Sequence, residues 1–279
     1  MVKIVTDSTA DLPLQLANDL DITVVPAYIR FGDDIYRDRI DISDEEFYQR
    51  LLSETVHPTT EPPTPEDFAD VYHRLSKEAD AIISIHISSK LSATYNSALK
   101  GKALLENDYP IEVIDSQLVT MGLGLLTTLA ASFTKSEHNL QQIVFRVKQS
   151  INSIHLLGLF DTLKFLALGG RIGKAKSLLG SVLNIKPMLT MRDGELEPYG
   201  QVRSRHDGIN KLIDFVTNST DLQDVAVVHS TTPDDANFLI DSLGSIFPKE
   251  KIKLTKLGPV LGVHAGPGIL FIALRENIT

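Results

Sequence analysis

The sequence predicts an α/β protein of two domains: an N-terminal α/β/α domain on a parallel sheet and a C-terminal two-layer α/β domain with a mixed sheet. In the first half, short strand-like runs alternate with amphipathic helical stretches, which is the pattern of βαβ units. In the second half, Asp193-Gly194 separates two strand-like runs, and this dipeptide indicates an antiparallel hairpin. We expect the N-terminal domain to cover residues 1–155 and the C-terminal domain residues 156–279.

The first half contains the alternating elements in order. Its expected strands are 3–7, 22–29, 81–87 and 112–115, and its expected helices are 14–20, 43–52, 65–79 and 91–107. The second helix has the clearest start, because Ser43 followed by Glu46 is a capping-box pair. Segment 56–65 holds four prolines, which favours an irregular surface loop. The apolar stretch 118–133 is too short to span a bilayer and predicts a buried helix.

The second half combines the hairpin with further strands and helices. Its expected strands are 156–160, 187–192, 195–200, 225–229, 251–256 and 268–274; its expected helices are 205–217 and 233–247, and a glycine-containing helical stretch reaches residue 183. Between residues 258 and 268 stand four glycines and two prolines, which predict an irregular backbone with His264 in its middle. This histidine is either a functional side chain held in a rigid loop or a structural one.

Composition excludes several classes of function. The formal charge of −9 opposes a surface that neutralises phosphodiester backbones, so we expect no nucleic-acid partner. The absence of cysteine excludes disulfides and Cys-ligated metals. The histidines lack ligand spacing, and the acidic residues Asp33, Asp34, Asp38 and Asp41 lack the spacing of a calcium loop, so we expect a solvated loop and no metal site. The first residues lack signal-peptide features, which favours the cytoplasm.

Hydroxyl-rich segments follow two of the expected strands. One contains Ser8 and Thr9, and the other contains Ser89 and Ser92. Both segments meet at the carboxyl edge of a parallel sheet, where ligands of open α/β sheets bind, and helix N-termini there favour an anion. Plain helix capping by the same serines is the alternative.

The stretch from Gly169 to Lys174 resembles a phosphate-binding loop only superficially. Three residues separate Gly169 from the Gly173-Lys174 pair, and Ala175 replaces the hydroxyl residue that would hold Mg²⁺. We therefore reject a nucleotide site. The stretch is either a glycine turn that exposes Arg171 to a carboxylate or phosphate, or a structural break in a helix.

Six segments in this order together resemble the DegV family, the bacterial fatty-acid-binding subunits of fatty acid kinase. The resemblance runs from residue 3 to about residue 274, and the segments are 6–13, 60–68, 88–98, 115–116, 169–172 and 262–268. Two departures stand out: Ala93 replaces a customary glycine, and Glu61-Pro62 replaces a customary Ser-Gln pair.

The resemblance implies a lipid-binding subunit without catalytic residues, whose ligand is a long-chain fatty acid lying between or within the domains. It implies no cofactor, a separate ATP-binding kinase as partner, and at most transient membrane contact. Thr60 and Ser92 resemble the carboxylate-binding hydroxyls, while Arg171, Arg203 and His264 resemble groups that serve phosphoryl transfer or partner contact. The supporting loop residues are Ser8, Ser89, Thr94, Ser116, Gly170 and Gly266.

Two other functions remain open at this point. One is a free-standing small-molecule kinase or hydrolase in which His264 is the general base and Arg171 the electrophile. The other is a sensor that changes partners when its ligand binds. Turnover without a second protein would distinguish the enzyme from the carrier.

Overall fold

The computed structural model describes residues 1–105, 108–136, 139–179 and 185–277. The expected helix end at residue 107 and the helical stretch to residue 183 therefore end outside the described residues. The N-terminal sheet has the order β2(Ile22–Val25), β1(Val2–Asp7), β6(Ala81–His86) and β7(Ile111–Asp115), and all its pairs are parallel. The predicted parallel sheet is confirmed.

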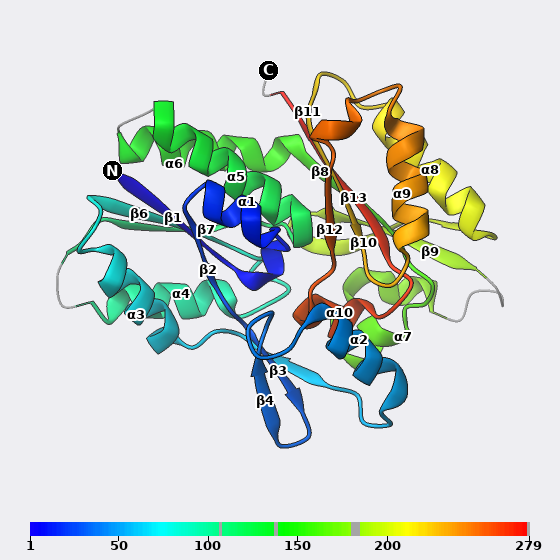
Figure 1. The fold of residues 1–279 in the computed structure, drawn as a ribbon, viewed down its shortest axis with the longest axis horizontal. Helices are drawn as coiled ribbons and strands as arrows, with labels where there is room; N and C mark the ends of the chain where they lie inside the picture. The colour runs from blue at the N-terminus through cyan, green and yellow to red at the C-terminus, as the bar shows by residue number, and fades with distance from the viewer. Residues whose placement is uncertain (106–107, 137–138, 180–184, 278–279) are drawn as a thin grey trace.

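Helices cover both faces of this sheet (Figure 1). On one face lie α3(Pro65–Leu75) and α4(Thr94–Ala103), and on the other lie α1(Leu14–Asp19), α5(Thr120–Ser136) and α6(Leu140–Ser150). Strand β6 shows why: Ile83 and Ile85 pack into the cluster that contains α5, while Ile82 packs against α3 and α4. All six residues of this strand are buried, as expected of a strand covered on both faces.

The second large sheet is mixed, also as predicted. Its strands follow the order β10(Glu195–Val202), β9(Lys186–Arg192), β8(Ile154–Leu159), β13(Leu270–Glu276), β11(Leu222–His229) and β12(Lys253–Lys256). Only the pair β11–β12 is parallel. The expected hairpin joins β9 to β10 through Asp193 and Gly194, which both have positive φ as a type I′ turn requires.

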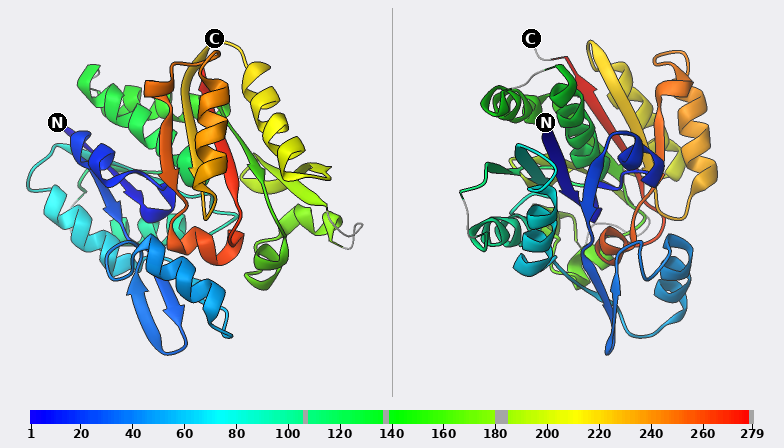
Figure 2. Two further views of the ribbon diagram at one scale, coloured as in Figure 1. Left: turned by 45° about the vertical axis from the view of Figure 1, so that its right-hand side comes forward. Right: turned by 60° about the vertical axis from the view of Figure 1, so that its left-hand side comes forward.

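Helix α5 lies between the two large sheets. Helices α8(Arg205–Thr217) and α9(Pro233–Leu243) cover one face of the mixed sheet, and α5 packs on the other (Figures 1 and 2). One hydrophobic cluster runs from the parallel sheet through α5 to the mixed sheet. The division at residues 155 and 156 therefore stays a proposal about folding units. In the described part of the chain, no helix is both long and apolar enough to cross a membrane.

A third sheet corrects two of the sequence expectations. It has the order β4(Asp34–Arg37), β3(Tyr28–Phe31) and β5(Thr59–Glu61), with α2(Asp44–Ser53) beside it. The single strand expected at 22–29 is wrong, because Pro26 lacks the amide proton that would continue pairing and the chain leaves the parallel sheet there. The irregular loop expected at 56–65 is wrong at β5, a three-residue edge strand whose flanking prolines lie outside its pairing.

The irregular backbone expected around His264 is also wrong, because the segment contains α10(Pro259–Ala265). Pro259 occupies the first helical turn, where no amide proton is needed, and Gly266 ends the helix with φ +79°. Gly262 is required inside it, since an added Cβ would lie 2.5 Å from the Phe47 ring. The prolines and glycines of this segment therefore mark the ends of a short helix instead of preventing one.

The remaining elements are short, and the start of α4 and the burial of the acidic loop also differ from expectation. The short elements are η1(Ser8–Ala10), η2(Ile151–Ser153), α7(Lys164–Leu168), η3(Gly173–Leu178) and η4(Lys249–Lys251). Helix α4 begins at Thr94, three residues later than expected, because Ser92 and its neighbours form a turn first. The acidic loop is not fully solvated, since Asp38 is buried beside the Arg39 guanidinium.

A buried carboxylate at Asp11 ties the three sheets together. It accepts hydrogen bonds from Thr120 Oγ1 at 2.6 Å and from the Gly258 amide at 2.8 Å, and Arg39 lies 3.5 Å away. Its backbone carbonyl accepts from Thr255 Oγ1 at 2.9 Å. Asp11 therefore connects the start of α5, the start of α10 and the segment after β4. Because α10 carries His264, this connection also positions the site described below.

We predict that Asp11 makes the free energy of unfolding fall between pH 4 and pH 7. Burial raises the pKa of Asp11 from 3.8 to about 7, against the opposing effect of Arg39. The folded state therefore holds this proton over a pH range in which the unfolded state has lost it, so stability declines as pH rises through that range. Urea unfolding should show the stability difference between wild type and Asp11→Asn shrinking as pH rises. A difference that grows with pH would contradict this account.

Candidate functional site

A narrow pocket opens between the two large sheets. Its cavity volume is about 70 Å³, within about 650 Å³ of empty space that includes open solvent at the mouth. An alkyl chain is only slightly wider than water, so this shape suits an unbranched chain better than a compact solute. The walls are apolar, formed by Ile87, Leu91, Val119, Phe160, Leu166, Leu196, Leu257, Val260, Leu261, Ala265 and Phe271.

Six polar side chains complete the lining. They are Thr9, Thr60, Ser92, Thr120, Arg171 and His264. Four of them are residues that the sequence singled out, brought together from β5, the turn before α4, the segment after α7, and helix α10. Arg171 is exposed, which marks the mouth, whereas Thr9 and Thr120 are 3% and 1% exposed and lie deeper.

Thr60 and His264 are joined across the pocket rim. The distance from Thr60 Oγ1 to His264 Nε2 is 2.8 Å. His264 Nδ1 is buried and, among the described residues, has no hydrogen-bond partner. We assign the proton to Nε2. A proton on Nδ1 would instead make a buried N–H group without an acceptor, which costs free energy. His264 then donates to Thr60, and the Thr60 proton is free for a ligand.

His264 is uncharged at neutral pH. Burial lowers its pKa to about 4, with further lowering by the positive charge of Arg171 and by His57. Burial also lowers the pKa of His57, whose ring packs against Phe165 with centroids 5.8 Å apart. The imidazole behind Thr60 is therefore a neutral donor, not a second cation.

Ser92 has a similar supporting partner. Thr94, expected as a supporting residue, lies with Oγ1 2.8 Å from Ser92 Oγ and donates its amide to the same oxygen at 3.3 Å. If Thr94 Oγ1 is the donor, the Ser92 proton points to the ligand. Thr60 and Ser92 then each accept a hydrogen bond from a neighbouring side chain, and each can donate its own proton to a ligand.

Other predicted site residues lie outside the pocket lining. Arg203 is exposed between β10 and α8. Ser8 accepts from the Ala27 amide at 3.1 Å, which holds the turn between β2 and β3. Ser89 donates to Asp115 at 2.5 Å at the end of the parallel sheet.

Three further predicted residues shape the loops around the pocket. Ser116 Oγ accepts from the Leu118 amide at 3.0 Å in the turn before α5. Gly170 and Gly266 have φ of +70° and +79°, and Phe165 packs against Gly266, where an added Cβ would lie 2.2 Å from its ring. These residues determine backbone positions instead of contacting the pocket.

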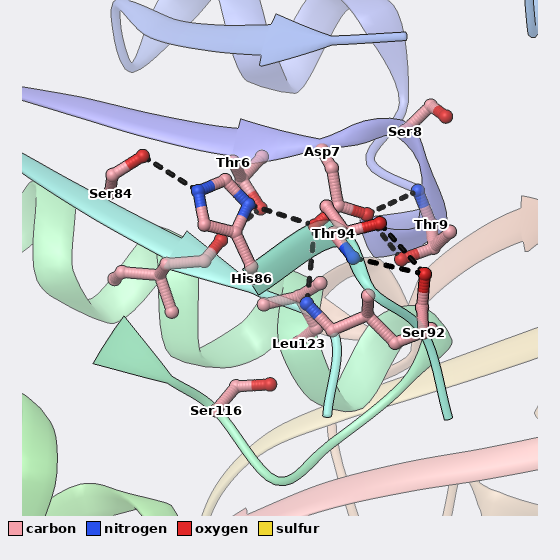
Figure 3. Close-up of polar contacts among 12 residues, drawn as sticks. Thr6, Asp7, Ser8, Thr9, Ser84, His86, Ser92, Thr94, Ser116 and Leu123 are labelled. Atoms are coloured by element: carbon pink, nitrogen blue, oxygen red, sulfur yellow. Dashed lines mark hydrogen bonds and ion pairs between the residues drawn. The ribbon is translucent and has the colours of Figure 1, made fainter. Parts of the chain in front are cut away.

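Sequence reasoning did not assign the buried network beside the pocket. Tyr72 donates to Ser84, Ser84 Oγ lies 2.7 Å from His86 Nε2, and His86 Nδ1 lies 3.0 Å from Asp7. Figure 3 shows this row continuing from Asp7 to Thr9. Although Ser84, His86 and Asp7 have the order of a hydrolase triad, all three are 0% exposed and no substrate reaches them. The row ties β1 to β6.

The pocket is not a metal site, and two of its polar residues were not predicted as site residues. Across the described ranges, no group of three or more His, Cys, Asp or Glu is arranged to hold a metal ion. Thr9 lay in a segment noted for its hydroxyls, but nothing in the sequence around Thr120 indicated a site. Its role depends on Asp11, which is 109 residues away in the chain.

The fold and the pocket define an α/β protein with two large sheets and an apolar pocket that carries hydroxyl side chains. A family model described as "Uncharacterised protein, DegV family" matches residues 1–277. The chain is 36% identical over 279 residues to a DegV domain-containing protein of Caldanaerobacter subterraneus, with 99% of each covered, and 34% identical to one of Streptomyces coelicolor, again with 99% of each covered. The chain belongs to the DegV family.

Solved structures show the same fold. A DegV family protein from Thermus thermophilus, described by its fatty acid binding, matches with a TM-score of 0.92 at 32% identity over 99% of both chains. A stearic acid-binding protein from Eubacterium ventriosum matches with a TM-score of 0.89 at 27% identity, also over 99% of both. DegV of Bacillus subtilis, a fatty acid binding protein, gives 0.88 at 26% identity over 99% of both.

We predict that Gly169→Ala displaces the His264 ring. A Cβ at Gly169 would lie 2.1 Å from His264 Nδ1, so the imidazole must shift, which changes its 2.8 Å contact with Thr60. Overpacking of this kind typically costs about 1–3 kcal/mol. Gly200→Ala is the matched control, because no atom lies within 4 Å of the added carbon. NMR of the His264 ring should show a change in Gly169→Ala alone; an unchanged ring environment would refute the close contact.

Proposed function

We propose that this protein binds one long-chain fatty acid, buries its acyl chain in the slot and holds its carboxylate at Thr60 and Ser92. The single observation that supports this most strongly is the pairing of a narrow apolar slot with two supported hydroxyls near its mouth. Family membership and the fatty-acid-binding relatives of known structure support the same ligand.

The apolar walls supply the driving force for binding. A sixteen-carbon acid has about 14 methylenes, and burial at ~0.8 kcal/mol each yields roughly 11 kcal/mol. Association and ordering cost about 4–15 kcal/mol, so most of the acyl chain must be buried away from water for the complex to persist. The slot meets this requirement because eleven of its seventeen lining residues are apolar.

The hydroxyls address the opposite problem, the cost of desolvating a carboxylate. A carboxylate accepts hydrogen bonds only, and Thr60 and Ser92 can each donate one. Uncharged donors leave lone pairs available on the carboxylate oxygens. A buried ion pair would bind these oxygens more strongly and make them less reactive. Neutral His264 fits this scheme, since its low pKa keeps a positive charge away from the bound oxygen.

We further propose that the exposed carboxylate attacks the γ-phosphate of ATP held by a separate kinase, giving an acyl phosphate. The carboxylate oxygen forms the new P–O bond, and ADP leaves with the electrons of the broken bond. Arg171 at the mouth suits the developing negative charge, and exposed Arg203 suits contact with the kinase. In this scheme the protein is a non-catalytic cytoplasmic subunit, and any contact with a membrane is transient.

We predict that Ser92→Ala and Thr60→Val each weaken fatty acid binding by about 5–100-fold, because removing a donor leaves part of the carboxylate unpaired. Ser97→Ala, which lies on α4 outside the pocket lining, is the control and should bind normally. Binding can be measured by fluorescent-analogue displacement and by mass spectrometry of lipid extracted from the purified proteins. Equal binding by all variants would remove the two hydroxyls from the site.

We predict that the purified protein with ATP and fatty acid forms no acyl phosphate until a kinase is added. Hydroxamate trapping of the acyl phosphate measures this directly. Turnover by the protein alone, lost in His264→Ala, would instead favour the free-standing enzyme.

A further inference from the structure

The four hydroxyl side chains of the pocket differ in what lies behind them. Thr60 and Ser92 each have a donor behind them and can point a proton at the ligand. Thr9 does the reverse, since it donates its own proton to the buried Asp7, and Thr120 donates in the same way to Asp11 above pH 7, where Asp11 is ionised. A hydroxyl has one proton and two acceptor lone pairs. Thr9 and Thr120 can therefore only accept a hydrogen bond from a ligand.

The Thr9 proton is firmly committed to Asp7. Asp7 is fully buried, and its oxygens also accept from the Thr9 amide at 3.1 Å, the Ile87 amide at 3.1 Å and His86 Nδ1 at 3.0 Å. Rotating the Thr9 hydroxyl toward the pocket would take one donor from a buried carboxylate, which is costly. Figure 3 shows the Thr9 hydroxyl on the side where Ser92 lies, and both residues line the pocket.

The Thr120 hydroxyl is fixed by a strained backbone as well as by its acceptor. Its Oγ1 donates to Asp11 at 2.6 Å, and its φ is +48°. A β-branched residue rarely adopts this left-handed conformation, which costs about 1–3 kcal/mol and persists only where the surroundings impose it. The backbone and the hydrogen bond to Asp11 thus hold Thr120 in place in a mostly apolar lining.

We propose that Thr9 and Thr120 form an acceptor subsite for a hydroxyl group on the acyl chain, so that the preferred ligands are fatty acids hydroxylated close to the carboxyl end. The inference rests on the proposed function and narrows its substrate class. We place these acceptors just inside the donors, because Thr9 and Thr120 are almost completely buried whereas Thr60 and Ser92 are partly exposed. An acid with a hydroxyl on its second or third carbon would match this order, because its carboxylate would lie at the donors and its hydroxyl just inside them, at the acceptors.

The same arrangement orients the ligand. A carboxylate has only lone pairs, so it is attracted to the donors Thr60 and Ser92 and repelled by the lone pairs of Thr9 and Thr120. A plain acid offers no proton to either buried acceptor, whereas a hydroxylated acid can donate its one hydroxyl proton to Thr9 or to Thr120, which lowers the free energy of the complex. The acceptors thus favour a hydroxylated chain over a plain one.

The test compares four sixteen-carbon acids on the full-length protein by calorimetry: the unsubstituted acid and its 2-hydroxy, 3-hydroxy and 12-hydroxy forms. The better of the 2- and 3-hydroxy acids should bind about 3–10-fold more tightly than the unsubstituted acid. The 12-hydroxy acid should bind more weakly, because its hydroxyl is buried among apolar walls. If every hydroxylated acid binds no better than the unsubstituted one, the subsite is refuted; if no acid binds, the proposed function fails instead.

Isosteric variants assign any preference to these two side chains. Thr9→Val and Thr120→Val each remove one acceptor while keeping shape, so the affinity ratio of hydroxylated to plain acid should fall to about one or below in the variant that loses the acceptor used by the ligand. Thr9→Ser keeps the hydroxyl and should keep the ratio. Because the ratio is measured within each protein, a general loss of stability does not imitate the result. A ratio unchanged in both valine variants would overturn the assignment.

Discussion

A fatty acid combines an oily chain with an anion, so its site must be dry along its length yet donate hydrogen bonds near its mouth. The structure meets this constraint by assembling apolar walls from the mixed sheet, α10 and the segments that follow β6 and β8, and by bringing Thr60 on β5 next to His264 on α10. The donors are uncharged hydroxyls, and the His264 imidazole behind Thr60 is neutral as well because burial lowers its pKa. An arginine in their place would hold the carboxylate more firmly but reduce its ability to attack a phosphate.

Buried carboxylates support this pocket from behind. Asp11 connects the start of α5 to the start of α10, and Asp7 connects the ends of β1 and β6. Both carboxylates also accept a hydrogen bond from a pocket threonine. The bonds that hold the sheets together therefore decide which pocket hydroxyls can donate to a ligand. Stability and ligand selection therefore depend on shared groups, which explains why ionisable side chains occur in so buried a place.

Local patterns predicted much of the fold. The Asp193-Gly194 hairpin and the boundaries of α8 are confirmed, because turn chemistry and helix periodicity are encoded within a few residues. The failures came where tertiary contacts decide: β5 exists only because β3 pairs with it, and Gly262 is tolerated in α10 because Phe47 leaves room for nothing larger.

The site was predictable only in part for the same reason. Local patterns singled out Ser92, Arg171 and His264, and the resemblance added Thr60; all four line one pocket, although their chemical roles stay predictions. Arg203 lies outside that lining. Thr120 escaped notice because its hydroxyl is directed by Asp11 from a distant part of the chain, and no local motif records such a pair.

A crystal structure with a bound sixteen-carbon acid tests the central claim most directly. The account predicts that the chain fills the slot between the two sheets, with a carboxylate oxygen within hydrogen-bonding distance of both Thr60 Oγ1 and Ser92 Oγ. An acid bound in the reverse direction, with its carboxylate at the deep end, or one bound only outside the slot, would contradict it.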